Sequence, residues 1–299
     1  MKLLRPFTIT PGNLTSNVAL DDAPEYSASA SYGVGDTVMS TAGVAPTYRR
    51  YESLAASNVG NALDDASKWL DLGPVNRWAM FDTKNGTATV NAGGINTTVS
   101  VNSRVDGLAL FGLTATSVRV IMTAGAYGTV YDKTYSLRSD SGVTSWYAYF
   151  TEEIVFDSEL VLTDLPLYGN PNVTVQISND SGATSCGTFV LGQTRDLGDT
   201  TYGAKGGIQD YSRKETDDFG NYTLVERAFA KRNTYRIVCE NNVVDALFNL
   251  LAEVRATPVV WLGSDDYAMT WTYGWARDWA VEISYPTKSF LTIEIEGLT

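Results

Sequence analysis

The chain has 299 residues, 44% of them hydrophobic, so it is long enough for two or three domains that each bury a core. Its formal net charge of −12 disfavours binding to nucleic acid or to an anionic membrane, because such binding gains affinity from Lys and Arg that neutralise phosphates. The chain contains no histidine, the usual general base near neutral pH and a common metal ligand. We therefore predict a protein that is not an enzyme and that has no metal site and no cofactor.

Residues 1–25 form a predicted N-terminal arm. A short apolar stretch at 3–9 is followed by the turn-forming residues 11–13 and by an acidic turn at 21–24. We expect the arm to pack as a strand against the rest of this chain or against a neighbouring molecule.

The sequence also bears on targeting. Arg5 and Pro6 interrupt the apolar stretch near the start of the chain, so we expect no signal peptide. Elsewhere the apolar runs are too short to span a bilayer, which predicts no membrane insertion.

Residues 26–75 predict a small β unit. Gly33, Gly35 and Asp36 indicate a turn, residues 37–39 a short strand, and residues 48–54 a second strand. A polar loop and a tryptophan-containing segment complete the unit. A unit of this size has a minimal core, so part of its aromatic surface is expected to be exposed.

The order of aromatic residues in this unit resembles that of small carbohydrate-binding modules of the chitin-binding type. Tyr26 stands where those modules usually have a leading Trp. The resemblance implies a sugar-binding site, in which flat rings stack on a pyranose while polar groups bind its hydroxyls. The candidate carbohydrate-binding residues are Tyr32, Tyr48, Tyr51 and Trp69. The alternative is that the same rings form the core of the unit.

Residues 76–200 predict a β-sandwich of jelly-roll type, similar in architecture to galactose-binding-like domains. Short stretches of alternating hydrophobicity recur between turns rich in Gly, Asn and Asp. They read INTTVSV, LALFGL, SVRVIMT, KTYSLR, WYAYFTEEIVF, LVLTDL, NVTVQIS and CGTFVLG. The run NRWAMFD at 76–82, expected to be extended, is similar to stretches that follow such a module in structural proteins of tailed bacteriophages.

Residues 201–222 predict an irregular connecting loop, and residues 223–299 predict a C-terminal β/α assembly domain. A helical stripe covers 243–254, with Asn241 or Asn242 as its N-cap and Pro258 beyond its end. Three strands follow, and one carries an aromatic stripe that we expect to pack on the helix: Trp271, Tyr273, Trp275 and Trp279. A sheet with one packed helix is similar to the ring domains of phage tail tubes and tail tips.

Paired carboxylates are the catalytic apparatus that remains available without histidine. Glu152-Glu153 and Asp265-Asp266 are adjacent pairs in segments that we expect to be extended, where neighbouring side chains point to opposite faces. Neither pair therefore converges on one substrate. The sequence also has no GxSxG or SxxK motif and no phosphate-binding glycine loop. Both cysteines are expected to be buried and reduced.

Together these features predict a mainly β, multi-domain protein. Its parts are a small β module, a jelly-roll-like β-sandwich and a C-terminal β-sheet domain with one packed helix. The resemblances imply a distal-tail-like structural component of a phage tail tip or baseplate, made in the host cytoplasm and located in the virion. Its expected partners are copies of itself, other tail proteins and host-surface glycan. The alternative is a carbohydrate-binding adhesin, and a glycan hydrolase is a third hypothesis.

Overall fold

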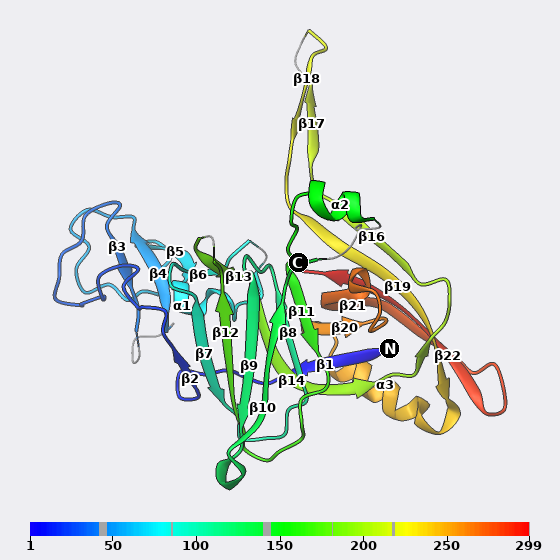
Figure 1. The fold of residues 1–299 in the computed structure, drawn as a ribbon. Helices are drawn as coiled ribbons and strands as arrows, with labels where there is room; N and C mark the ends of the chain where they lie inside the picture. The colour runs from blue at the N-terminus through cyan, green and yellow to red at the C-terminus, as the bar shows by residue number, and fades with distance from the viewer. Residues whose placement is uncertain (42–46, 85, 140–144, 181, 217–218, 299) are drawn as a thin grey trace.

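The computed structural model describes residues 1–41, 47–84, 86–139, 145–180, 182–216 and 219–298. Strands make up 47% of the structure and helices 10%, and the strands form several sheets (Figure 1). This confirms the predicted mainly β, multi-domain fold class.

A ten-stranded sheet runs through the molecule. Its strands are β1 (Lys2–Pro6), β8 (Gly107–Phe111), β11 (Glu159–Leu162), β14 (Thr188–Asp196), β15 (Asp199–Thr200), β16 (Lys205–Asp210), β19 (Phe229–Glu240), β20 (Val259–Leu262), β21 (Trp271–Glu282) and β22 (Lys288–Gly297). Their order is β11–β8–β14–β1–β20–β21–β22–β19–β15, and β16 also pairs with β19.

Strand β1 lies inside this sheet and connects the part that ends in β14 with the part that begins at β20. Leu4 lies opposite Thr194 of β14 on one side and opposite Val260 of β20 on the other. Alternation along the strand places Leu3 and Leu4, both fully buried, in clusters on opposite faces. The predicted arm therefore packs within this chain. The boundary predicted at residue 200 does not separate two sheets, because β14 belongs to the same sheet as β19 to β22.

A five-stranded sheet covers one end of the long sheet and completes the predicted β-sandwich. In spatial order it contains β10 (Thr129–Ser136), β9 (Ser117–Thr123), β12 (Asn172–Ser178), β7 (Ile95–Ser100) and β2 (Leu14–Ser16), with the short helix η1 (Gly125–Tyr127) between β9 and β10. Val118 and Val120 of β9 share a core with Leu108 and Leu110 of β8. The chain passes between the two sheets from β7 to β8 to β9, and again from β10 to β11 to β12.

One predicted strand is a helix instead. The stretch WYAYFTEEIVF begins with α2 (Trp146–Thr151), and the side chain of Ser145 accepts a hydrogen bond from the backbone N of Ala148 at 3.1 Å. This cap favours a helix, and the aromatic run lacks the alternation that a half-buried strand needs. Glu152 and Glu153 consequently follow the end of a helix rather than lying on a strand.

Residues 26–75 form the predicted small β unit. Its sheet contains β3 (Thr37–Met39), β4 (Arg49–Ser53) and β5 (Trp69–Pro74) in that order. The NRWAMFD run that follows begins with the short helix α1 (Asn76–Ala79), which corrects the extended segment expected there. Beyond it, β6 (Thr89–Asn91) pairs with β13 (Thr184–Cys186).

A two-stranded hairpin projects beyond the rest of the molecule (Figure 1). It consists of β17 (Arg213–Thr216) and β18 (Tyr222–Val225), and it continues outward from β16 and β19. The connecting loop predicted at 201–222 therefore contains strands. Strand β17 could not be recognised from the sequence, because all of its residues are exposed and its fold requires no alternation of apolar and polar residues.

The predicted C-terminal helix is confirmed as α3 (Val244–Glu253), preceded by the short helix η2 (Asn241–Val243). Leu247 and Leu251 of α3 pack on one face of the long sheet, beside the sandwich core. The predicted N-cap is wrong, because the residue before α3 is Val243. Asn241 instead donates from Nδ2 to the carbonyl of Tyr285 at 2.8 Å.

The aromatic stripe of β21 divides between two faces. A register irregularity between Ala276 and Asp278 shifts the strand, and a bulge of this kind reverses which face later residues occupy. Trp279 meets Phe248 of α3 edge-on at 4.9 Å between ring centroids, as predicted. Tyr273 lies on the opposite face and stacks on Phe111 at 6.4 Å. The expectation that one face carries all four aromatic residues is therefore wrong.

Candidate functional site

Two of the four candidate sugar-binding residues lie in the core of the small unit. Trp69 is 3% exposed and Tyr51 is 2% exposed, and both share a cluster with Val38 and Leu63. The Trp69 indole Nε1 donates to the carbonyl of Asn61 at 3.2 Å. A ring this deeply buried offers no face on which a pyranose could stack.

Tyr32 is half-buried on the same cluster. Its ring centroid lies 5.3 Å from that of Trp69 and 6.0 Å from that of Tyr26. Its hydroxyl accepts from the backbone N of Ser27 at 2.7 Å and lies 3.2 Å from the Ser27 carbonyl, to which it donates. The polar end of Tyr32 is therefore used inside the unit, and the ring supports the core.

Tyr48 belongs to a different set of contacts. Its ring lies 5.3 Å from that of Trp78 in α1, followed by Phe81 at 5.5 Å and then Phe189 at 5.4 Å. This row of rings connects the small unit to the sandwich core. The four candidates therefore do not form one platform, and their placement favours the alternative in which they hold the unit together.

A pocket that the sequence did not indicate lies elsewhere, at one end of β20. Its volume is about 610 Å³, and it opens between β15, the 201–204 segment and the loop that runs from Gly263 into η3 (Ala268–Thr270). The side chains that matter most for its chemistry are Lys2, Asp199, Tyr202, Asp265, Asp266 and Tyr267. The pair Asp265-Asp266 lies in the loop rather than on a strand, so the opposite-face argument does not apply to it.

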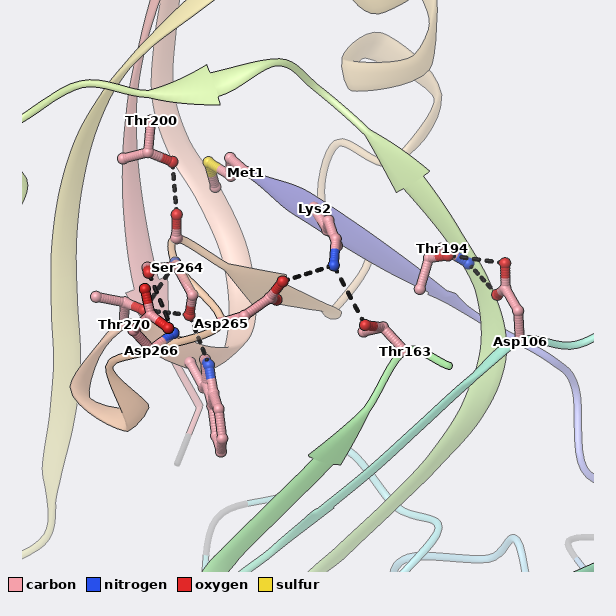
Figure 2. A network of polar contacts seen from close by, with 12 residues as sticks. Met1, Lys2, Asp106, Thr163, Thr194, Thr200, Ser264, Asp265, Asp266 and Thr270 are labelled. Carbon is pink, nitrogen blue, oxygen red and sulfur yellow. Dashed lines mark hydrogen bonds and ion pairs between the residues drawn. The ribbon is translucent and has the colours of Figure 1, made fainter. Parts of the chain in front are cut away.

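Partly buried hydrogen bonds hold the pocket loop in place (Figure 2). The Thr270 hydroxyl accepts from the backbone N of Ser264 at 3.0 Å and lies 2.6 Å from the carbonyl of Tyr267, to which it can donate. The Trp271 indole donates to the carbonyl of Ser264 at 2.9 Å. Thr200 of β15 donates to the carbonyl of Gly263 at 2.5 Å. These bonds fix the loop before any ligand arrives.

The charged groups of the pocket carry both signs but are mainly acidic. Lys2 Nζ lies 2.7 Å from Asp265 Oδ2 and 3.3 Å from Thr163 Oγ1, as Figure 2 shows. Asp199 and Asp266 make no side-chain hydrogen bond within the described part of the chain. The pocket thus offers carboxylate acceptors together with two ammonium groups, that of Lys2 and that of the Met1 N-terminus, which interacts electrostatically with Asp199 and Asp265.

A third feature is an exposed apolar surface on and after α2. Trp146, Tyr147 and Phe150 are 79%, 79% and 77% exposed, and Ile154 and Val155 follow at 57% and 62%. We call these five residues the α2 patch. Among the residues of α2 itself, only Ala148 is buried. The rings of Trp146 and Phe150 stack with 6.4 Å between their centroids, and exposed apolar side chains that lie together mark interaction sites more often than isolated exposed residues do.

The described residues contain no group of three or more Cys, Asp or Glu side chains placed to hold a metal ion. No helix within the described ranges has the length and hydropathy to cross a bilayer. Both thiols are buried and unpaired, and burial raises the pKa of Cys186 to about 12, which leaves it protonated near neutral pH.

Comparisons of the sequence with protein-family models and with curated proteins found no match.

Proposed function

We propose that this chain is a structural component of a bacteriophage tail tip or baseplate and that it works by assembling with copies of itself. The α2 patch carries the proposal. An exposed aromatic side chain gains about 1.5 to 3 kcal/mol when it is fully buried. Three such rings on one turn and a half of helix are a concentrated source of binding energy, and aromatic residues are enriched at the energetic centres of protein interfaces.

The projecting hairpin supports the same function. All residues of β17 are exposed, and in β18 only Val225 is partly buried. A two-stranded hairpin is marginally stable in water without further packing. Tyr222 and Leu224, 62% and 70% exposed, give it an apolar face that a neighbouring subunit could cover. A closed ring would supply such a neighbour to every copy.

The location in a phage tail rests on the resemblances described for the small unit, the NRWAMFD run and the sheet with one packed helix. The adhesin alternative is weaker in its original form, because Tyr51 and Trp69 are core residues. An antibody against this chain should label one end of the tail of the particle that encodes it. Labelling of the capsid, or of no particle, would contradict the tail location.

Self-assembly is tested by mass photometry and negative-stain electron microscopy of the purified full chain. We expect a closed oligomer for the wild type. The double variant Trp146→Ser/Phe150→Ser should shift the population to monomer while its circular dichroism stays unchanged, because both side chains are exposed. Tyr127→Ser is the matched control, since Tyr127 is an equally exposed aromatic residue (75%) outside the patch. A monomeric wild type, or a double variant that still assembles, would overturn the proposal.

A further inference from the structure

The pocket at the end of β20 has exposed aromatic rings at its rim. Tyr202 is fully exposed and Tyr267 is 64% exposed, and both line the cavity. Neither ring has an aromatic stacking partner among the described residues. Flat, solvent-facing rings beside a polar cavity are the arrangement with which proteins bind the apolar face of a pyranose. The volume, about 610 Å³, accommodates one or two sugar rings.

The polar groups of the pocket match hydroxyl groups on such a ligand. Sugar hydroxyls both donate and accept hydrogen bonds. Asp199 and Asp266 supply carboxylate acceptors that make no side-chain hydrogen bond within the described chain, and the Lys2 ammonium supplies a donor that is already oriented by Asp265 and Thr163. Hydrogen bonds to charged groups are roughly twice as strong as those between neutral groups.

The rigidity of the loop adds to this match. The 263–270 loop is held by hydrogen bonds between its backbone and the side chains of Thr200, Thr270 and Trp271. A site that is ordered before binding loses little further conformational freedom when a ligand enters. The loop therefore presents Asp265, Asp266 and Tyr267 as a fixed surface.

From these observations we infer that the pocket binds a neutral glycan through stacking on Tyr267 and Tyr202 and through hydrogen bonds to Asp199 and Asp266. The carboxylates of Asp199, Asp265 and Asp266 outnumber the two ammonium groups of the pocket, those of Lys2 and of the Met1 N-terminus, and this excess repels anionic sugars such as those that carry sialic acid. A simple cation is less well matched, because it would meet the ammonium of Lys2. This inference does not depend on self-assembly, and it places glycan recognition outside the small unit.

Binding is tested on the full-length chain with an array of neutral and sialylated glycans. Saturation-transfer NMR with the methyl glycosides of glucose, galactose and N-acetylglucosamine then measures the sugar contact directly. We expect binding to neutral members only. Tyr267→Ala and the double variant Asp199→Ala/Asp266→Ala should each weaken it by about tenfold or more. Tyr285→Ala is the control, since Tyr285 is similarly exposed (59%) but does not line the pocket.

The outcomes separate the alternatives. Absence of binding to every neutral glycan would overturn the inference, as would unchanged binding in both pocket variants. Binding of a lysine-rich peptide that neutral sugars fail to displace would reassign the pocket to cationic groups and overturn the glycan assignment. Mass photometry of the same variants tests self-assembly separately from sugar binding. A pocket variant that loses sugar binding but keeps the wild-type oligomer would show that the two properties are independent.

Discussion

At the scale of single residues, Trp69 and Trp146 show how one side chain type takes opposite roles. Trp69 is buried among Tyr26, Tyr32 and Tyr51, and its N–H is satisfied by a carbonyl. Trp146 lies on a helix with 79% of its surface exposed. The local sequence alone cannot distinguish these roles, because each tryptophan has a polar residue before it and an apolar or aromatic residue after it. The difference arises from contacts between segments that are distant in the chain.

The burial of Trp69 predicts a structural effect of its removal. We expect Trp69→Ala to destabilise the small unit by roughly 3 to 5 kcal/mol, the usual cost of truncating a buried Trp. Urea denaturation followed by limited proteolysis within residues 26–75 measures this loss. Leu72→Ala is the control, since Leu72 lies on the same strand but is 38% exposed, and its stability should change by less than about 1 kcal/mol. A stable, protease-resistant Trp69→Ala protein would show that the ring is not a core residue.

At the scale of elements, β14 depends on a glycine for its close approach to β1. Gly192 pairs with Pro6 of β1 and with Gly107 of β8. A Cβ atom at Gly192 would lie 1.8 Å from the carbonyl oxygen of Arg5. The contact is with backbone, so it can be relieved only by moving a strand.

We therefore expect Gly192→Ala to destabilise the protein by about 3 kcal/mol or more. Thermal unfolding monitored by circular dichroism measures the change. Gly93→Ala provides the comparison, because a Cβ atom there meets nothing within 4 Å and its backbone is not in the left-handed region. Equal melting temperatures for the two variants would contradict the assigned register between β1 and β14.

Most strands of the sandwich could be predicted from the sequence, because one face of each is buried and polarity alternates along it. β7, β9 and β12 coincide closely with INTTVSV, SVRVIMT and NVTVQIS. Elements were not evident from the sequence where burial imposes no periodic alternation of apolar and polar residues. Strand β17 is exposed on both faces, and α2 is an aromatic run whose helix depends on the cap at Ser145. The bulge in β21 could not be predicted from the sequence either, because it depends on how β21 pairs with β22.

At the scale of the whole molecule, the sites could not be derived from local patterns. The pocket combines Lys2, Asp199 and the 263–270 loop, which are brought together only because β1 and β15 belong to one sheet with β20. Asp265 and Asp266 were considered from the sequence only as an adjacent pair of carboxylates, without the other residues that line the pocket. The four aromatic candidates of the small unit were chosen by their order in the chain, which did not show that Tyr51 and Trp69 are buried and that Tyr48 contacts Trp78.

The same long sheet predicts how the molecule unfolds. Leu4 of β1 contacts a buried cluster that includes Phe111 and Val190 from the sandwich and Leu262 and Tyr273 from the C-terminal strands. Because one strand serves both halves, we expect them to open as a single cooperative unit. Native-state hydrogen exchange, followed by mass spectrometry at increasing urea concentration, should show the amides of β12 and β22 losing protection together.

The variant Leu4→Ala provides a second hydrogen-exchange test of whether the two halves open together. Truncation of a fully buried leucine costs about 2 to 5 kcal/mol, and here the loss should appear equally in peptides from β12 and from β22. Leu167→Ala, at a leucine that is 61% exposed, should leave both unchanged. If the exchange of β22 accelerated while β12 kept its protection, the sandwich and the C-terminal strands would be independent domains joined only by strand pairing. If both accelerate together, the first residues of the chain are part of the core that both halves share.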